Sequence, residues 1–178
     1  LVPVNIEEFG DGLSVPDDQI RIYLALREAA RMRLFLHSPW LERDLYAAVE
    51  QYAAGIRLDT EGIERAAQSV DPMDPGSLQA VFDGASFIAA PDATQQAALD
   101  QLELLVALVE GWVDVVVAEA ARPLESAAAL RETMNRRRAS GGPAEQAFAA
   151  LVGLELRPRR LREAAAFWEH VTAEHGTE

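Results

Sequence analysis

One short stretch of the chain holds charged residues at a spacing that could do chemistry. Glu28 lies between Arg27 and Arg31, which are four residues apart. On a helix, two histidines at this spacing share one face and grip a zinc ion, while a glutamate between them polarises a water molecule. Arginine stays protonated and offers no lone pair to a metal. The stretch therefore has a glutamate that could act as a general base, but it has no histidine at the two positions that would bind zinc.

A second set of charges lies on the segment expected to form the longest helix. Asp100, Glu103, Glu110 and Asp114 fall on one face of that helix. Acidic side chains on so apolar a helix need basic partners, because a buried charge is tolerated only when it is paired.

The arginines lie on an apolar stripe that is expected to face the core, together with Ile20, Leu24, Leu34 and Phe35. We therefore expect Arg27 and Arg31 to pair with Glu110, Asp114 or Glu28. The alternative is a solvated face with ordinary i, i+4 pairs, each giving about 0.2–0.5 kcal/mol.

The elements that must position these charges are predicted to be helices, because alanine and leucine dominate and β-branched runs are scarce. We expect one all-α domain over 1–178. Residues 1–16 are predicted to be an extended entry segment or short hairpin, since prolines and glycines punctuate them. Helices are predicted near 17–36, 39–54, 60–70, 76–82, 93–121, 126–138, 143–153 and 158–175.

Composition excludes several functions. The 178 residues carry a formal net charge of −13, which disfavours nucleic acid as a partner. The absence of cysteine excludes disulfides, thiolate zinc sites and cysteine nucleophiles. Residues 99–121 are apolar, but their five acidic residues would each cost about 2.5–3.5 kcal/mol at mid-bilayer, so we expect no membrane span. We expect a cytoplasmic protein.

The remaining polar and aromatic residues favour structural roles. His37 lies at a predicted helix end, where the dipole favours it, and His170 and His175 are too poorly spaced to share a face. Trp40 and Trp112 are predicted to be core aromatics. The run 136–138 is a cationic helix end, with binding of an acidic partner as the alternative. We find no EF-hand, P-loop or dinucleotide-binding pattern.

The segments around these residues also resemble a family. The stretch 26–35, followed by Pro39-Trp40-Leu41 and then 52–56, is similar to zincin-like metallopeptidases, some of which are associated with deazaflavin coenzyme biosynthesis. In that pattern H-E-x-x-H is followed by a phenylalanine, then P-W-L, then Y-x-x-G-I. The stretch 109–112 resembles a later segment with an E-G-H core. The resemblance covers nearly the whole chain without the family's N-terminal part, so we expect a fragment.

The departures from the family pattern decide what the resemblance implies. Arg27 and Arg31 stand at the positions of the ligand histidines, and Trp112 stands at the histidine of E-G-H. Glu28 and Glu110 are retained, and the family's third ligand is either position 110 or position 112. A catalytic zinc site needs three protein ligands, so no metal or other cofactor is expected. From its size, Trp112 is expected to fill the space above the lost metal.

Three readings of function follow. The first is a catalytically degenerate zincin-like domain that binds a protein or peptide or plays a structural role, with Glu28 as a vestigial base and Asp114 and Glu103 as ion-pair partners. The alternative is a hydrolase in which Glu28, Glu110 and Asp114 hold a hard cation such as magnesium. Arg27 and Arg31 argue against it, since they repel a cation. The third is a plain helical interaction domain with no history of chemistry.

Overall fold

A computed structural model describes residues 2–69, 89–140 and 160–176. Seven helices make up the ordered elements of these ranges, which confirms the predicted all-α fold. No described helix combines the length and the apolar character that a bilayer crossing requires. Two predicted helices, 76–82 and 143–153, lie outside the described residues.

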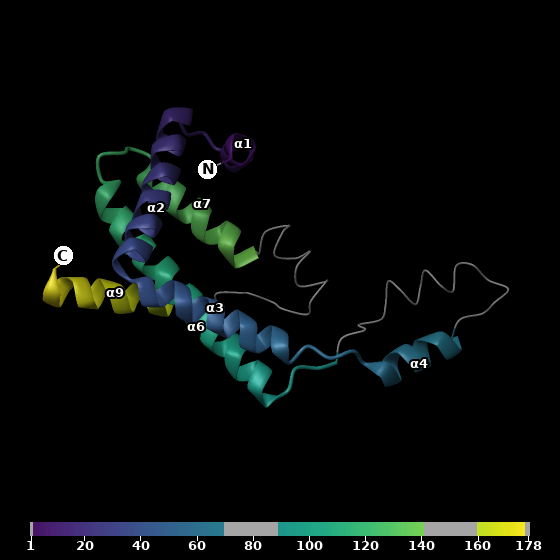
Figure 1. The fold of residues 1–178 in the computed structure, drawn as a ribbon. Helices are drawn as coiled ribbons and strands as arrows, with labels where there is room; N and C mark the ends of the chain where they lie inside the picture. Colours follow the sequence, from purple (N-terminus) through teal and green to yellow (C-terminus); the bar gives the residue numbers. More distant parts are fainter. Residues whose placement is uncertain (1, 70–88, 141–159, 177–178) are drawn as a thin grey trace.

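The long helix α6, Ala93–Ala120, is the centre of the fold. It begins where the sequence predicts, because the Asp92 side chain accepts hydrogen bonds from the backbone N–H groups of Thr94 and Gln95, both at 2.9 Å. The backbone N–H of Asp92 in turn donates to Oε1 of Gln95 at 3.1 Å, which completes a capping box. Buried residues recur around nearly its whole circumference, as expected of a helix packed on several sides. Helices α2, α3, α7 and α9 all contact it (Figure 1).

Helices α2, Asp17–His37, and α3, Pro39–Ala54, form a continuous bent pair on one side of α6. The bend falls at Ser38, because Pro39 cannot continue the helix but suits the first position of the next. The N–H of Ser38 still donates to the carbonyl of Leu34 at 2.9 Å. In Figure 1, α3 runs along the first part of α6 while α2 crosses its later part. The crossing brings the middle of α2 onto α6.

The prediction of an extended segment or hairpin over 1–16 is wrong. Residues Pro3–Gly10 form helix α1, which packs against α2. Pro3 starts the helix, since its missing N–H costs nothing in the first turn, and buried Phe9 anchors it to the main apolar cluster. The glycines end the helix instead of forming a hairpin, with Gly12 in the left-handed region at φ 74°.

Helices α7, Ala127–Ser140, and α9, Leu161–His175, complete the packing around α6. Helix α9 approaches α6 closely at Gly111, and its Trp168 donates a hydrogen bond from Nε1 to the carbonyl of Leu108 at 2.9 Å. Helix α4, Thr60–Ser69, has no buried residue and contacts no other described helix. Figure 1 draws it apart from the others.

Candidate functional site

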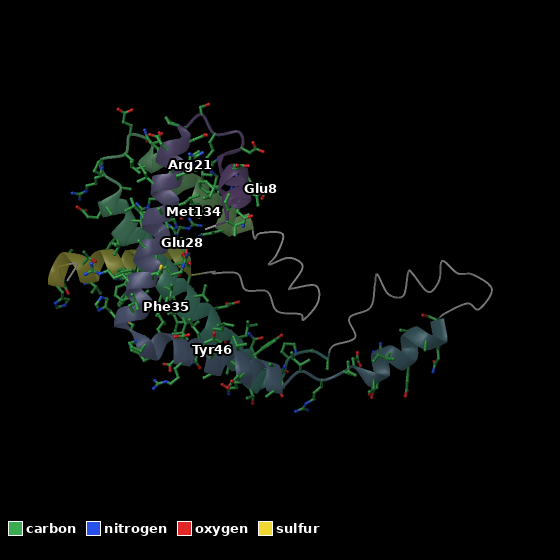
Figure 2. All side chains as sticks on the ribbon, turned by 45° about the horizontal axis from the view of Figure 1, so that its top comes forward. Glu8, Arg21, Glu28, Phe35, Tyr46 and Met134 are labelled. Carbon is green, nitrogen blue, oxygen red and sulfur yellow. The ribbon has the colours of Figure 1, made fainter. Side chains whose placement is uncertain are left out.

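The predicted charges meet where α2 crosses α6. Arg27 donates from Nη2 to Glu110 Oε2 at 3.0 Å, and Arg31 donates from Nη2 to Glu110 Oε1 at 2.9 Å. One turn of α2 thus presents two guanidinium groups to the two oxygens of one carboxylate. Arg31 also pairs with Glu28, which lies midway along α2 (Figure 2). The structure therefore forms the ion pairs expected from the stripe on α2.

Helix α7 adds two arginines to the cluster. Arg138 forms an ion pair with Glu110 Oε2, so that carboxylate contacts three guanidinium groups. Arg131 donates to Asp114 Oδ2 from Nε at 2.9 Å and from Nη2 at 2.6 Å. It also reaches Glu169 of α9 at 3.6 Å. The cluster thus ties four helices together through charges.

Burial makes this cluster unusual for an ion-pair network. The side chain of Arg27 is 2% exposed and that of Asp114 6%, while Glu110 is 14% exposed. Arg27 Nη1 and Asp114 Oδ1 lie 3.8 Å apart, and neither atom has a hydrogen-bond partner within the described structure. Buried charges of this kind require their partners, because each one removed leaves an uncompensated charge behind.

The pKa values reflect this competition between burial and charge. Burial alone would raise the pKa of Glu110, but Arg138, Arg31 and Arg27 outweigh it and hold that pKa below its ordinary value. Burial lowers the pKa of Arg138, and the neighbouring charge of Arg27 lowers it further. For Arg31, the carboxylates of Glu110 and Glu28 overcome burial and raise the pKa.

The rotation of α6 separates positions 110 and 112. Successive residues of a helix are turned by about 100°, so the two side chains point about 200° apart. Glu110 faces Arg27 and Arg31, whereas Trp112 packs against the main apolar cluster. Of the two positions that the family pattern offers as a third ligand, position 110 is the one that faces positions 27 and 31.

The remaining acids of the predicted set lie away from this crossing. Glu103 is partly buried and lies seven residues before Glu110, about 10 Å along the axis of α6. Asp100 is exposed and accepts a hydrogen bond from Gln96 at 2.9 Å. The structure therefore brings together Glu28, Glu110 and Asp114 and leaves the earlier acids farther along the helix.

A metal ion does not fit the residues at this crossing. Arginine side chains replace the two ligands that α2 would supply, and the oxygens of Glu110 already accept hydrogen bonds from them. Three guanidinium groups around one carboxylate repel any added cation. Within the described ranges, no three histidine, aspartate or glutamate side chains gather as a metal site.

The two arginines of α7 were missed by the sequence reasoning, which treated 136–138 as a simple cationic helix end. Arg131 and Arg138 are seven residues apart, so they share a face at the helical period, and this spacing was the available signal. Arg137, in the same run, contacts helix α1. It donates to the carbonyls of Glu8 and Phe9 and lies over the Phe9 ring at 4.8 Å, which fixes α1 to α7.

Comparison with known proteins supplies the family. A search of curated proteins and a search of solved structures gave no significant match. The family model described as zincin-like metallopeptidase matches residues 1–178, the whole of the chain. This match agrees with the resemblance of the segments around Glu28 and Glu110. The chain therefore belongs to the zincin-like metallopeptidase family.

Proposed function

We propose that this domain has given up zinc chemistry and acts as a binding or structural module for a protein or peptide. One observation carries the proposal, namely that the Glu110 carboxylate is held by the guanidinium groups of Arg27, Arg31 and Arg138. A hydrolytic zinc site needs ligand lone pairs and an open coordination position. At the crossing of α2 and α6, Arg27 and Arg31 supply no lone pair, and both oxygens of Glu110 already accept hydrogen bonds from them.

The ion pairs substitute for a metal in one respect. A structural metal links the helices that supply its ligands, and here Glu110 links α6 to α2 and to α7. Loss of the ligands therefore does not require loss of the fold. Trp40 was predicted to be a core aromatic, and that prediction is wrong, because its side chain is 51% exposed. Tyr46 is 63% exposed on the same helix, and such large exposed side chains favour a binding role.

The test is to restore the ligands. We expect the wild-type chain to retain no zinc after exposure to excess metal and dialysis. The variant Arg27→His, Arg31→His, Arg138→Gln is expected to retain about one zinc per chain, because two imidazoles and Glu110 then face one another. Mass spectrometry of the metal content gives the stoichiometry.

The matched control is Arg21→His with Arg33→His, which adds two histidines to exposed positions of the same helix and should retain no zinc. One zinc held tightly by the wild-type chain would contradict the proposal. A folded triple variant that takes up no zinc would show that positions 27, 31 and 110 do not form a ligand set.

The alternative is a hydrolase that holds a hard cation at Glu28 and Glu110. One observation favours it, since the side chain of Glu28 is 43% exposed and therefore open to solvent. Its carboxylate is nevertheless paired with Arg31. Calorimetric titration with magnesium separates the two readings, because saturable binding together with magnesium-dependent cleavage of a peptide would favour the hydrolase.

A further inference from the structure

Helix α2 carries a second apolar face that no described helix covers. On this outer face Ile22 is 47% exposed, Met32 65% and Leu36 75%. Ala25 and Ala29 lie between them and are also exposed. The five residues are spaced by three, four, three and four positions along the helix. We call this set, Ile22, Ala25, Ala29, Met32 and Leu36, the outer stripe.

The outer stripe lies opposite the buried face of α2. At about 100° per residue, its direction is roughly half a turn from that of Ile20, Leu24 and Arg27, which face α6. A helix that is apolar on two opposite sides is typical of one covered on both sides. Alternating steps of three and four residues are the seam spacing of a two-helix coiled coil, so a second helix is the occupant that matches this stripe.

Charged residues beside the outer stripe indicate which helix would cover it. In the heptad defined by the stripe, Glu28 and Arg33 flank the seam at the g and e positions, which pair across two parallel helices. In a parallel pair of identical helices, Glu28 of each copy lies opposite Arg33 of the other. An antiparallel pair with full overlap of the stripe would instead bring the two Glu28 carboxylates together. Arg33 has no ion-pair partner among the described residues.

We propose that the outer stripe joins two copies of this chain through a parallel pairing of their α2 helices. The contact leaves the pairing of Arg27 and Arg31 with Glu110 intact, because Arg27 faces α6 on the opposite side of α2. Glu28, which also pairs with Arg31, is the one cluster residue that borders the outer stripe. The proposal is therefore independent of the proposed loss of zinc chemistry. Its failure would leave that assignment untouched.

The mass of the protein in solution tests the pairing. The chain has a mass of 19.4 kDa, so sedimentation velocity is expected to show a species of twice that mass. The measurement should be made at about 0.15 M salt. At this concentration the Debye length is about 8 Å, which limits the repulsion between two chains that each carry a net charge of −13.

Met32→Lys is the informative variant. It places two ammonium groups against each other at the seam, and we expect the dimer to weaken at least about a hundredfold. Within one chain the same lysine lies four residues after Glu28, a favourable i, i+4 pair, so the helix itself should not suffer. Leu104→Lys, at a 43% exposed position on α6, is the control and should leave the dimer unchanged. A wild-type monomer at all concentrations, or a Met32→Lys dimer of wild-type strength, would overturn the proposal.

Cysteine cross-linking tests the orientation, because the chain has no cysteine of its own. In a parallel pair, identical positions face each other, so Ile22→Cys and Leu36→Cys are each expected to form a disulfide-linked dimer under mild oxidation. An antiparallel pair would link neither variant with itself, and that result would overturn the parallel arrangement.

Discussion

At the scale of single residues, Glu110 is the centre of the charged cluster. It is the only contact that Arg27, Arg31 and Arg138 have in common among the described ion pairs. Without its charge, three guanidinium groups would converge with nothing between them. Among the described ion pairs, Asp114 reaches only Arg27 of these three, at 3.8 Å and without a hydrogen bond, while its Oδ2 is held by Arg131. The carboxylate therefore decides whether the arginines stabilise the crossing or destabilise it.

Glu110→Gln is accordingly expected to lower the free energy of unfolding by about 3–5 kcal/mol, the range found when one partner of a buried pair is removed. Urea unfolding followed by circular dichroism measures it. Arg43→Gln is the control, since Arg43 is 75% exposed in its pair with Asp44 and should change stability by no more than about 0.5 kcal/mol. Equal losses in the two variants would mean that the buried cluster contributes no more than a surface pair.

The lowered pKa of Glu110 predicts a pH dependence as well. A carboxyl group whose pKa is lower in the folded chain stabilises that chain above its ordinary pKa of about 4.3, and the stabilisation is lost as pH falls toward the folded value. The gap in stability between the wild type and Glu110→Gln should therefore be constant near neutral pH and narrow below about pH 4.

Urea titrations of both proteins at several pH values between 7 and 3 measure this gap. Glu50→Gln, at an exposed position on α3, provides the comparison and should differ little from the wild type at any pH. A gap that widens on acidification would show that Glu110 is not stabilised in its charged form.

At the scale of elements, Gly111 sets how closely α9 can approach α6. A methyl group at this position would lie 2.8 Å from the carbonyl carbon of Ala164 and from the backbone nitrogen of Ala165. Backbone atoms cannot rotate away, so the two helices would have to separate. In an open helix, alanine would instead be favoured over glycine by about 1 kcal/mol.

We therefore expect Gly111→Ala to destabilise the protein by about 1–3 kcal/mol, the usual cost of overpacking, despite its better helix propensity. Fluorescence should shift to the red as Trp168 loses its contact with the Leu108 carbonyl. Gln101→Ala, at an exposed position of α6, tests propensity alone and should be nearly neutral. A stabilised Gly111→Ala protein would show that α9 does not pack at this glycine.

The elements themselves were largely predictable from local signals. Pro39, the Asp92 capping box and the turn at Gly55 place helix ends within a residue or two of the observed ones, because caps act through neighbouring residues. Helix α1 was missed for the opposite reason. Its prolines and glycines are typical of a loop, and the burial of Phe9 in a cluster with distant helices, which favours the helix, is not visible in the local sequence.

The candidate site was predictable only in part. The pairing of Arg27 and Arg31 with Glu110 follows from two helix faces that each carry charges within an apolar stripe. The seven-residue spacing of Arg131 and Arg138 places them on one face of α7, but which carboxylates that face meets depends on the angle between α7 and α6, which the sequence does not give. The outer stripe was not predicted either, because α2 carries apolar residues on two opposite faces and the sequence alone does not tell which of them the bundle leaves exposed.

At the scale of the whole molecule, the packing is uneven. The helices α2, α3, α7 and α9 all gather on α6, and charges join three of them to it or to one another. Helix α4 has no contact with another described helix and buries none of its residues. Regions with few buried contacts open at a small free-energy cost compared with the core.

Limited digestion with trypsin should reveal this difference as an order of cleavage. Arg57 and Arg65 lie before and within α4 and are each 76% exposed, so both should be cut early. Arg27, at 2% exposed, and Arg138, at 18%, require the α6 bundle to open first and should be cut only after a long delay. Mass spectrometry of the products over time gives the order.

Arg21 is the control, because it is 65% exposed but lies in α2, which packs on α6. It should therefore resist cleavage longer than Arg65. Equal rates at Arg21 and Arg65 would contradict the prediction, because α4 would then open no more readily than α2.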